Sequence, residues 1–150
     1  MKNRSRALFW VFYALILLGL VFFSSCRFSS SVTKNPEFSV SRDSLCGILK
    51  EIANFENIEI RGTLFKSTGS PEKSELTVKV INPKDVSLSN DQAINRRCFQ
   101  VALEISRHLK KPEEFDSYKV LFEVRRVENG ITTSSYKGSA FKSSELSSKL

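Results

Sequence analysis

The chain has 150 residues, a formal net charge of +7, three cysteines and one histidine. Three of its 23 basic residues lie before residue 7, which leaves 20 basic against 16 acidic residues, an excess of +4. Because the sequence has neither a basic stripe nor a recognisable nucleic-acid-binding module, this balance argues against nucleic-acid binding. It fits a mild attraction to anionic lipid headgroups instead.

The first 25 residues have the pattern of a membrane-targeting segment. Residues 1–6 are basic, and residues 7–23, ALFWVFYALILLGLVFF, carry no charge. A helix satisfies the backbone groups of such a run inside a bilayer, and the basic flank stays on the cytoplasmic side. Residues 1–25 are therefore predicted to be a signal peptide or membrane segment.

Two small residues and a cysteine follow the apolar run, in the box Phe23-Ser24-Ser25-Cys26. This box resembles the end of bacterial lipoprotein signal peptides, although Phe23 stands where those signals usually have Leu. The resemblance implies cleavage before Cys26 and acylation of its thiol with fatty acids such as palmitate. It also implies a cell-envelope location, with the chain anchored in a bacterial membrane and its domain outside the cytoplasm.

Two alternatives to a lipoprotein signal remain open from the sequence. Residues 7–23 are at the short end for a spanning helix and at the long end for a signal-peptide core. The segment could therefore be an uncleaved anchor or an ordinary cleaved signal. All three alternatives place the domain on the far side of the inner membrane, and none decides between inner and outer membrane.

A Ser-rich stretch separates this segment from the first predicted helix. Residues 26–40 are predicted to be the lipidated cysteine and a flexible tether. A folded domain is expected over residues 41–143. Its first helix, about 42–54, has Leu45, Leu49 and Ile52 on one face, and Ser41 or Asp43 caps it.

Four strands and a second helix complete the expected domain. Alternation at Ile58, Ile60 and Leu64 predicts a strand, in which Gly62 marks a bulge or a close approach, and a second strand ends at Asn82-Pro83. A box from Ser89 to Gln92 starts a helix at about 90–110. The last two strands, 117–127 and 131–141, flank the hairpin signal Asn129-Gly130, and residues 144–150 read as a polar tail.

The element order is α-β-β-α-β-β. Two hairpins and two one-faced helices predict an α+β fold with a four-stranded antiparallel sheet and both helices packed on one face.

The sequence contains no pattern typical of a catalytic or cofactor site. No glycine-rich phosphate loop or Gly-x-Ser-x-Gly elbow is present. His108 has no paired nucleophile, and no spacing matches a set of metal ligands. The sequence therefore predicts a protein that is not an enzyme and has no cofactor and no metal.

Two features are candidates for other roles. Cys46 and Cys98, on different helices, form a disulfide or stay reduced; an oxidising compartment permits the bridge. On the outward sheet face, Phe65, Ile81 and Leu121 interrupt a polar surface and are candidates for a partner-binding patch. The last strand either accepts a partner strand by edge pairing or is protected from pairing by Lys137 and Lys142.

The function expected from these observations is a membrane-anchored envelope lipoprotein whose small, non-catalytic domain binds a protein partner or helps an envelope assembly. The alternative is a carrier that holds a small apolar or envelope-derived ligand in a cleft between helices and sheet. An exported hydrolase is the third hypothesis, and it would need a polar cluster that spacing does not reveal.

Overall fold

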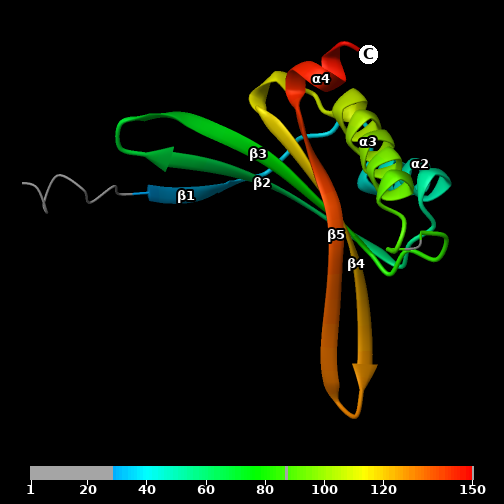
Figure 1. The fold of residues 1–150 in the computed structure, drawn as a ribbon. Helices are drawn as coiled ribbons and strands as arrows, with labels where there is room; N and C mark the ends of the chain where they lie inside the picture. The colour runs from blue at the N-terminus through cyan, green and yellow to red at the C-terminus, as the bar shows by residue number, and fades with distance from the viewer. Residues whose placement is uncertain (1–28, 87, 150) are drawn as a thin grey trace, which may run out of the picture. The chain divides into compact units, whose positions relative to one another are not determined.

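A computed structural model describes residues 29–86 and 88–149. The predicted signal segment and Cys26 lie outside this range. The elements in chain order are β1 (Ser29–Lys34), α2 (Arg42–Ile52), β2 (Asn57–Ser67), β3 (Ser70–Ile81), α3 (Asp91–His108), the 3₁₀ helix η1 (Pro112–Glu114), β4 (Ser117–Glu128), β5 (Ile131–Lys142) and α4 (Ser143–Ser147) (Figure 1).

The described residues fall into two compact units. Residues 31–65, 72–86 and 88–149 belong to one unit. Residues 29–30, and residues 66–71 at the tip of the β2–β3 hairpin, belong to the other unit. This tip is a tight turn in which Gly69 has a φ of +79°, a conformation that glycine adopts without steric cost.

Both long helices begin at a side-chain cap. The Ser41 hydroxyl accepts a hydrogen bond from the Ser44 backbone N–H at 3.2 Å, which confirms Ser41 as one of the two predicted caps. At α3 the cap is Asn90, whose Oδ1 accepts from the Ala93 N–H at 3.0 Å. The capping box predicted at Ser89 is therefore displaced by one residue.

The strands form a mixed sheet in the order β1-β2-β3-β4-β5. β3 and β4 run parallel, with Leu76 beside Tyr118 and Val80 beside Phe122, whereas β4 and β5 run antiparallel. The prediction of a four-stranded antiparallel sheet is therefore wrong in both strand number and direction. The connection explains the parallel pair, because it contains the 18-residue helix α3, and parallel neighbours need a long, usually helical, crossover.

The fifth strand, β1, lies within the stretch predicted to be a flexible tether. Its sequence, SSSVTK, has no alternation of apolar residues, and five of its six residues are exposed. Gly62 accounts for its close approach to β2. A Cβ on Gly62 would lie 2.3 Å from the Lys34 carbonyl oxygen and 2.8 Å from the Phe115 ring. A larger residue at this position would push β1 away.

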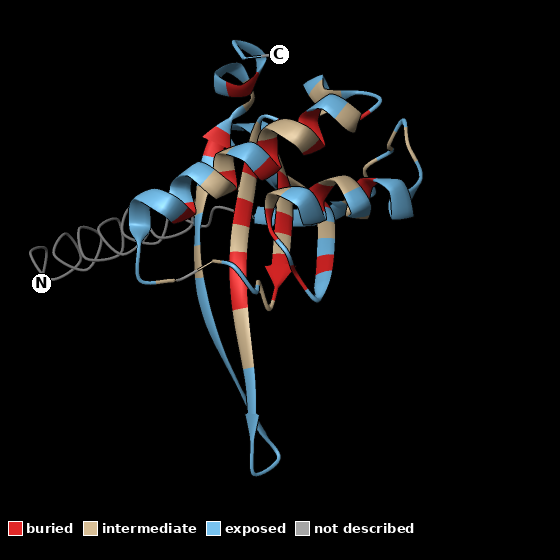
Figure 2. Cartoon of the chain, turned by 90° about the vertical axis from the view of Figure 1, so that its right-hand side faces the viewer, coloured by how far each residue is buried: buried red, intermediate tan, exposed pale blue. Residues whose placement is uncertain are grey.

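One continuous core lies between the helices and one face of the sheet (Figure 2). Both helices contribute their apolar faces to it, and the sheet contributes the even-numbered residues of β3 and the first half of β4. The fully buried members include Leu49, Leu76, Val78, Val80, Cys98, Ala102, Ile105, Tyr118, Val120 and Phe122. The opposite sheet face is not covered by α2 or α3 and is called the open face below.

Residues 143–147 form the short helix α4, within the region predicted to be a polar tail. Leu146 is fully buried in the core. The Ser143 N–H donates to the Asp116 carbonyl at 2.9 Å, so the start of α4 is bonded to the start of β4. One apolar residue among the serines is enough to attach this segment.

The β4–β5 hairpin has an unbroken register from Ser117 opposite Lys142 to Glu128 opposite Ile131. Its turn has Asn129 and Gly130 at φ values of +52° and +77°, which confirms the predicted hairpin signal. β4 pairs with β3 only as far as Glu123. Beyond that point the two strands continue alone, and residues 126–133, here called the arm, extend away from α2 and α3 (Figures 1 and 2).

Candidate functional site

Cys46 and Cys98 are both free thiols in the structure. Cys46 is half-buried on α2. Cys98 is fully buried on α3, and its Sγ lies 3.6 Å from the Val120 carbonyl oxygen, the acceptor of its hydrogen bond. Burial raises the pKa of the Cys98 thiol to about 11. Because the thiolate is the reactive form, Cys98 is expected to be an inert core residue at neutral pH.

The predicted patch of Phe65, Ile81 and Leu121 does not form one exposed surface. Phe65 is 45% exposed, Ile81 is only 3% exposed and Leu121 is half-buried. Ile81 was expected on the surface because it belongs to the outward set of its strand. That prediction is wrong, because Ile81 is buried.

Glu123 is a buried carboxylate on this open face. It is 1% exposed, although the alternation of β4 places it opposite the core. Arg125 donates to it from Nε at 2.6 Å and from Nη2 at 3.1 Å. The hydroxyls of Ser134 and Tyr136, both on β5, donate to Glu123 Oε1 at 2.9 Å and 3.1 Å.

These bonds lower the pKa of Glu123 to about 2, and the Arg125 hydrogen bonds are the largest cause. The carboxylate is therefore charged at every physiological pH. The network reaches β2 as well, since Arg125 Nη2 lies 3.4 Å from Glu59 Oε1. The Asn129-Gly130 turn already fixes the register that brings Tyr136 opposite Glu123, so the sequence contained a signal for this cluster.

Asn82 ends β3 at the same place. Its φ is +51°, its N–H donates to the Glu123 carbonyl at 2.8 Å, and its Oδ1 accepts from the Arg125 N–H at 2.8 Å. Asn82 thus supplies the last hydrogen bonds to β4 from the β3 side. The arm begins at Arg126, the residue after the one that Asn82 accepts from.

The arm exposes two large apolar side chains near its turn. Val127 is 71% exposed and Ile131 is 67% exposed. They project from opposite faces of the hairpin, because Val127 shares the face of Glu123 and Arg125, whereas Ile131 is opposite Glu128. Ile131 therefore lies on the side of the hairpin that faces the helices.

A groove of about 480 Å³ lies at the root of the arm. Its lining is apolar on one side and polar on the other, and consists of Val86, Leu88, Val124, Arg126, Thr133 and Ser135. The β4–β5 register places Val124, Arg126, Thr133 and Ser135 on the same face of the hairpin as Ile131. The groove and Ile131 therefore belong to one side of the hairpin.

Lys137 is bonded away from the free edge of β5. Its Nζ donates to the Leu88 carbonyl at 2.9 Å and forms an ion pair with Asp91 at the start of α3. This arrangement leaves the outer edge of residues 131–136 without Lys137, one of the two lysines predicted to protect the strand from pairing.

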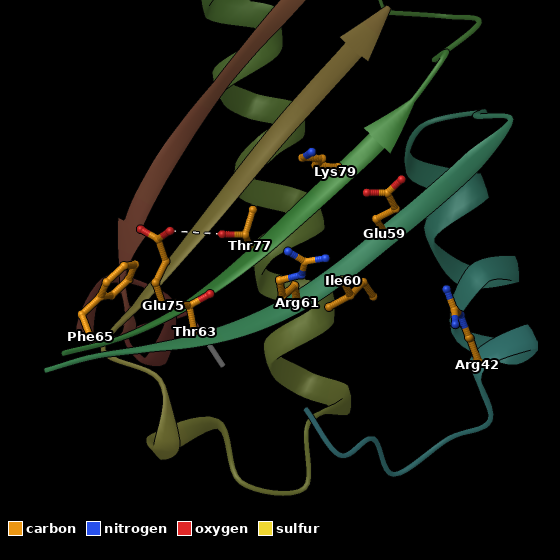
Figure 3. Close-up of a pocket in the computed structure, with 9 residues that line it drawn as sticks. All are labelled: Arg42, Glu59, Ile60, Arg61, Thr63, Phe65, Glu75, Thr77 and Lys79. Carbon is orange, nitrogen blue, oxygen red and sulfur yellow. Dashed lines mark hydrogen bonds between the residues drawn. The ribbon is translucent and has the colours of Figure 1, made fainter. Parts of the chain in front are cut away.

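A second groove, of about 490 Å³, lies on the open face over β2 and β3 (Figure 3). Arg61, Thr63 and Phe65 project into it from β2, and Glu75, Thr77 and Lys79 from β3. The remaining lining residues are Arg42, Glu59 and Ile60. The Thr77 hydroxyl donates to Glu75 Oε1 at 3.1 Å, the bond drawn in the figure.

Within residues 29–86 and 88–149, no group of three or more His, Cys, Asp or Glu side chains could hold a metal ion. His108 is the last residue of α3, and its Nε2 lies 3.2 Å from Glu104 Oε1. Among the helices of the described part of the chain, none combines the length and apolarity that a bilayer span requires.

Comparison of the chain with known protein families, with curated proteins and with solved structures found no match.

Proposed function

We propose that this chain is a membrane-anchored envelope lipoprotein, acylated at Cys26, whose domain binds a protein partner through the β4–β5 arm. The observation that carries the partner-binding role is the arm itself. It places Val127 and Ile131 in solvent, and Ile131 lies on the same face of the hairpin as a partly apolar groove at the root of the arm. Exposed apolar side chains next to such a groove are typical of protein-interaction sites.

The arm makes no contribution to the core that would explain its length. A two-stranded ribbon is marginally stable by itself, yet residues 126–133 continue the ladder beyond the last β3–β4 pair. The Glu123 cluster and Lys137 hold its root on both faces. A rigid root with an exposed tip suits an element that presents side chains to another protein.

A protein partner is better supported than a small apolar ligand. The space between helices and sheet is occupied by the side chains of one continuous core, where a carrier would need an internal cleft. The root groove, by contrast, is an open surface feature. Its polar side, formed by Arg126, Thr133 and Ser135, suits a peptide surface with hydrogen-bonding groups.

The anchor is tested by the intact mass of the membrane-fraction protein, wild type beside Cys26→Ala. A lipoprotein gives a mass that starts at residue 26 with added acyl groups, and this form is lost in the variant. A full-length mass that the substitution does not change would contradict acylation and favour an uncleaved anchor.

The binding site is tested by photo-crosslinking in cells, with a photoreactive amino acid at Ile131. Thr132 is the matched control, because it is adjacent and exposed but lies on the other face of the hairpin. Gln100, exposed on α3, is the distant control. A discrete adduct at Ile131 and none at Gln100 is expected. Equal, diffuse labelling at all three positions would contradict a binding site on the arm.

A further inference from the structure

The open face of the sheet carries basic groups that the domain itself does not neutralise. Arg42, Arg61 and Lys79 line the open-face groove, and Lys119 lies beside Thr77 in the β3–β4 register. Within the described part of the chain, none of these four has a carboxylate within 4.0 Å.

The acidic groups of the same face are largely engaged. Glu59 and Glu123 share Arg125, and Glu75 accepts a hydrogen bond from Thr77. Glu75 keeps its negative charge, because the Thr77 hydroxyl is neutral. The basic residues on or beside this face, Arg42, Arg61, Lys79, Lys119 and Arg125, still outnumber the acidic residues Glu59, Glu75 and Glu123, so the net charge is positive. Phe65, 45% exposed at the groove, adds an aromatic ring to these cations. Clusters of basic residues are typical of surfaces that meet anionic lipid headgroups.

The start of the domain is close to Cys26 along the chain. β1 begins at Ser29, three positions after Cys26, so an extended chain covers at most about 10 Å between them. Lys34, eight positions after Cys26, is within about 28 Å of it by the same count. The Lys34 carbonyl contacts the site of Gly62, next to Arg61. Because β1 begins within the stretch expected to be a tether, fewer residues separate Cys26 from the first strand than a tether over residues 26–40 would give.

We propose that the open face, with Arg61, Lys79 and Lys119, and the adjacent Arg42 at the start of α2 lie against the anionic headgroups of the membrane in which Cys26 is anchored. This inference rests on the proposed lipid anchor, which fixes the membrane near β1. The headgroup phosphates supply the negative charge that this face lacks. The helix-facing side of the arm, with Ile131 and the root groove, then stays available for a protein partner.

The test uses the mature, membrane-anchored protein with Thr77→Cys, reconstituted into vesicles of phosphatidylcholine alone or with phosphatidylglycerol. The rate of labelling by an impermeant maleimide is measured at that position by peptide mapping, which separates it from Cys46 and Cys98. Gln100→Cys, on α3, is the matched control. Thr63→Cys, in the same groove, replaces Thr77→Cys if that variant does not fold.

Labelling at Thr77→Cys is expected to fall about fivefold or more in the anionic vesicles, while Gln100→Cys is unchanged. Raising the salt concentration, or adding Arg61→Gln with Lys79→Gln, should restore the rate, because both remove the electrostatic attraction. Equal labelling in the two lipids, with the protein still floating with the vesicles, would overturn this inference and leave the anchor intact.

Two other outcomes would also overturn it. Labelling of Thr77→Cys that is slower than that of Gln100→Cys by the same factor in both lipids means that a second protein copy covers the face. Protein that does not float with either vesicle means that the anchor itself is absent, in which case the proposed function fails with the inference.

Discussion

The β4–β5 hairpin contains two regions that share one hydrogen-bond ladder but differ in burial and in their pairing with β3. In the base, β4 residues 117–123 pair with β3 as well as β5, and Tyr118, Val120 and Phe122 are fully buried. In the arm, residues 126–133 pair only with each other, and every one of them is exposed. The base therefore differs from the arm both in its burial and in its additional pairing with β3.

This difference indicates where the stability of the fold lies. Local opening of a segment requires less free energy where few apolar contacts are lost. The base is therefore expected to open only with global unfolding, whereas the arm can open and close by itself. Glu123 marks the boundary, since it is buried but its partners Ser134 and Tyr136 lie on the exposed strand.

The largest effect is expected in the base, from Phe122→Ala. Removing this fully buried ring leaves a cavity in the core, which lowers the free energy of unfolding by about 3–5 kcal/mol. Urea denaturation at neutral pH measures the loss. A loss of less than about 1 kcal/mol would mean that the base is not the stable half of the hairpin.

Gly138→Ala is expected to be the next most damaging change. Its new Cβ would lie 2.0 Å from the Val120 carbonyl oxygen and 2.9 Å from the Leu121 Cα, so β5 would have to move away from β4. Such overpacking lowers the free energy of unfolding by about 1–3 kcal/mol.

The matched control for Gly138→Ala is Gly47→Ala in α2, where a Cβ meets nothing within 4 Å. This change should raise the free energy of unfolding by about 0.5–1 kcal/mol, because alanine favours the helix. Denaturation midpoints of the two variants should therefore shift in opposite directions. Shifts in the same direction would contradict the close approach of β5 to β4.

Glu123→Gln tests the boundary between the regions. Losing hydrogen bonds to a charged group lowers the free energy of unfolding by about 2 kcal/mol at neutral pH. Glu51→Gln, on the exposed side of α2, serves as the control and should change it by less than about 0.5 kcal/mol.

The same variant predicts a pH dependence. Folding lowers the pKa of Glu123 from 4.5 to about 2, so its contribution is complete above about pH 4.5 and is lost as the pH falls toward 2. The difference in unfolding free energy between wild type and Glu123→Gln should shrink over that interval. A difference that stays constant from pH 7 to pH 2 would assign the effect to packing and not to charge.

The smallest effect on stability is expected in the arm. Ile131→Ser and Val127→Ser remove exposed side chains and should change the free energy of unfolding by less than about 0.5 kcal/mol. Ile131→Ser should nevertheless abolish crosslinking from a photoreactive group at Thr133 in the root groove. A variant that is stable and still crosslinks fully would show that the partner does not use this face.

Much of the element order could be predicted from residue periodicity, because the apolar stripes of α2, α3, β3 and β4 follow their ideal spacings. The parallel β3–β4 pairing was missed, although the helical connection between the strands indicated it. β1 was missed for a different reason. Its polar residues carry no alternation, and the strand depends on Gly62, which is 28 positions later in the chain than Lys34.

In the candidate sites too, local sequence signals predicted some features, whereas others depend on residues distant in the chain. The free edge of β5 and its hairpin turn follow from local signals, namely a thinly apolar strand after Asn129-Gly130. Ile81 was placed on an open surface, since alternation shows which face a residue lies on but not what covers it. Lys137 could equally have protected the edge, and only the position of Asp91 shows otherwise.

The parallel seam between β3 and β4 has a consequence for how the chain folds. The two-residue turn lets β4 and β5 pair after closing a short loop, whereas pairing Glu75 with Ser117 closes a loop of about 40 residues. We therefore expect the hairpin to form early and the seam to limit the folding rate. In stopped-flow refolding, Val78→Ala at the seam should slow folding more than Thr132→Ala in the arm. Docking of β3 beside β4, with α3 packed over them, is then the rate-limiting step in forming the sheet.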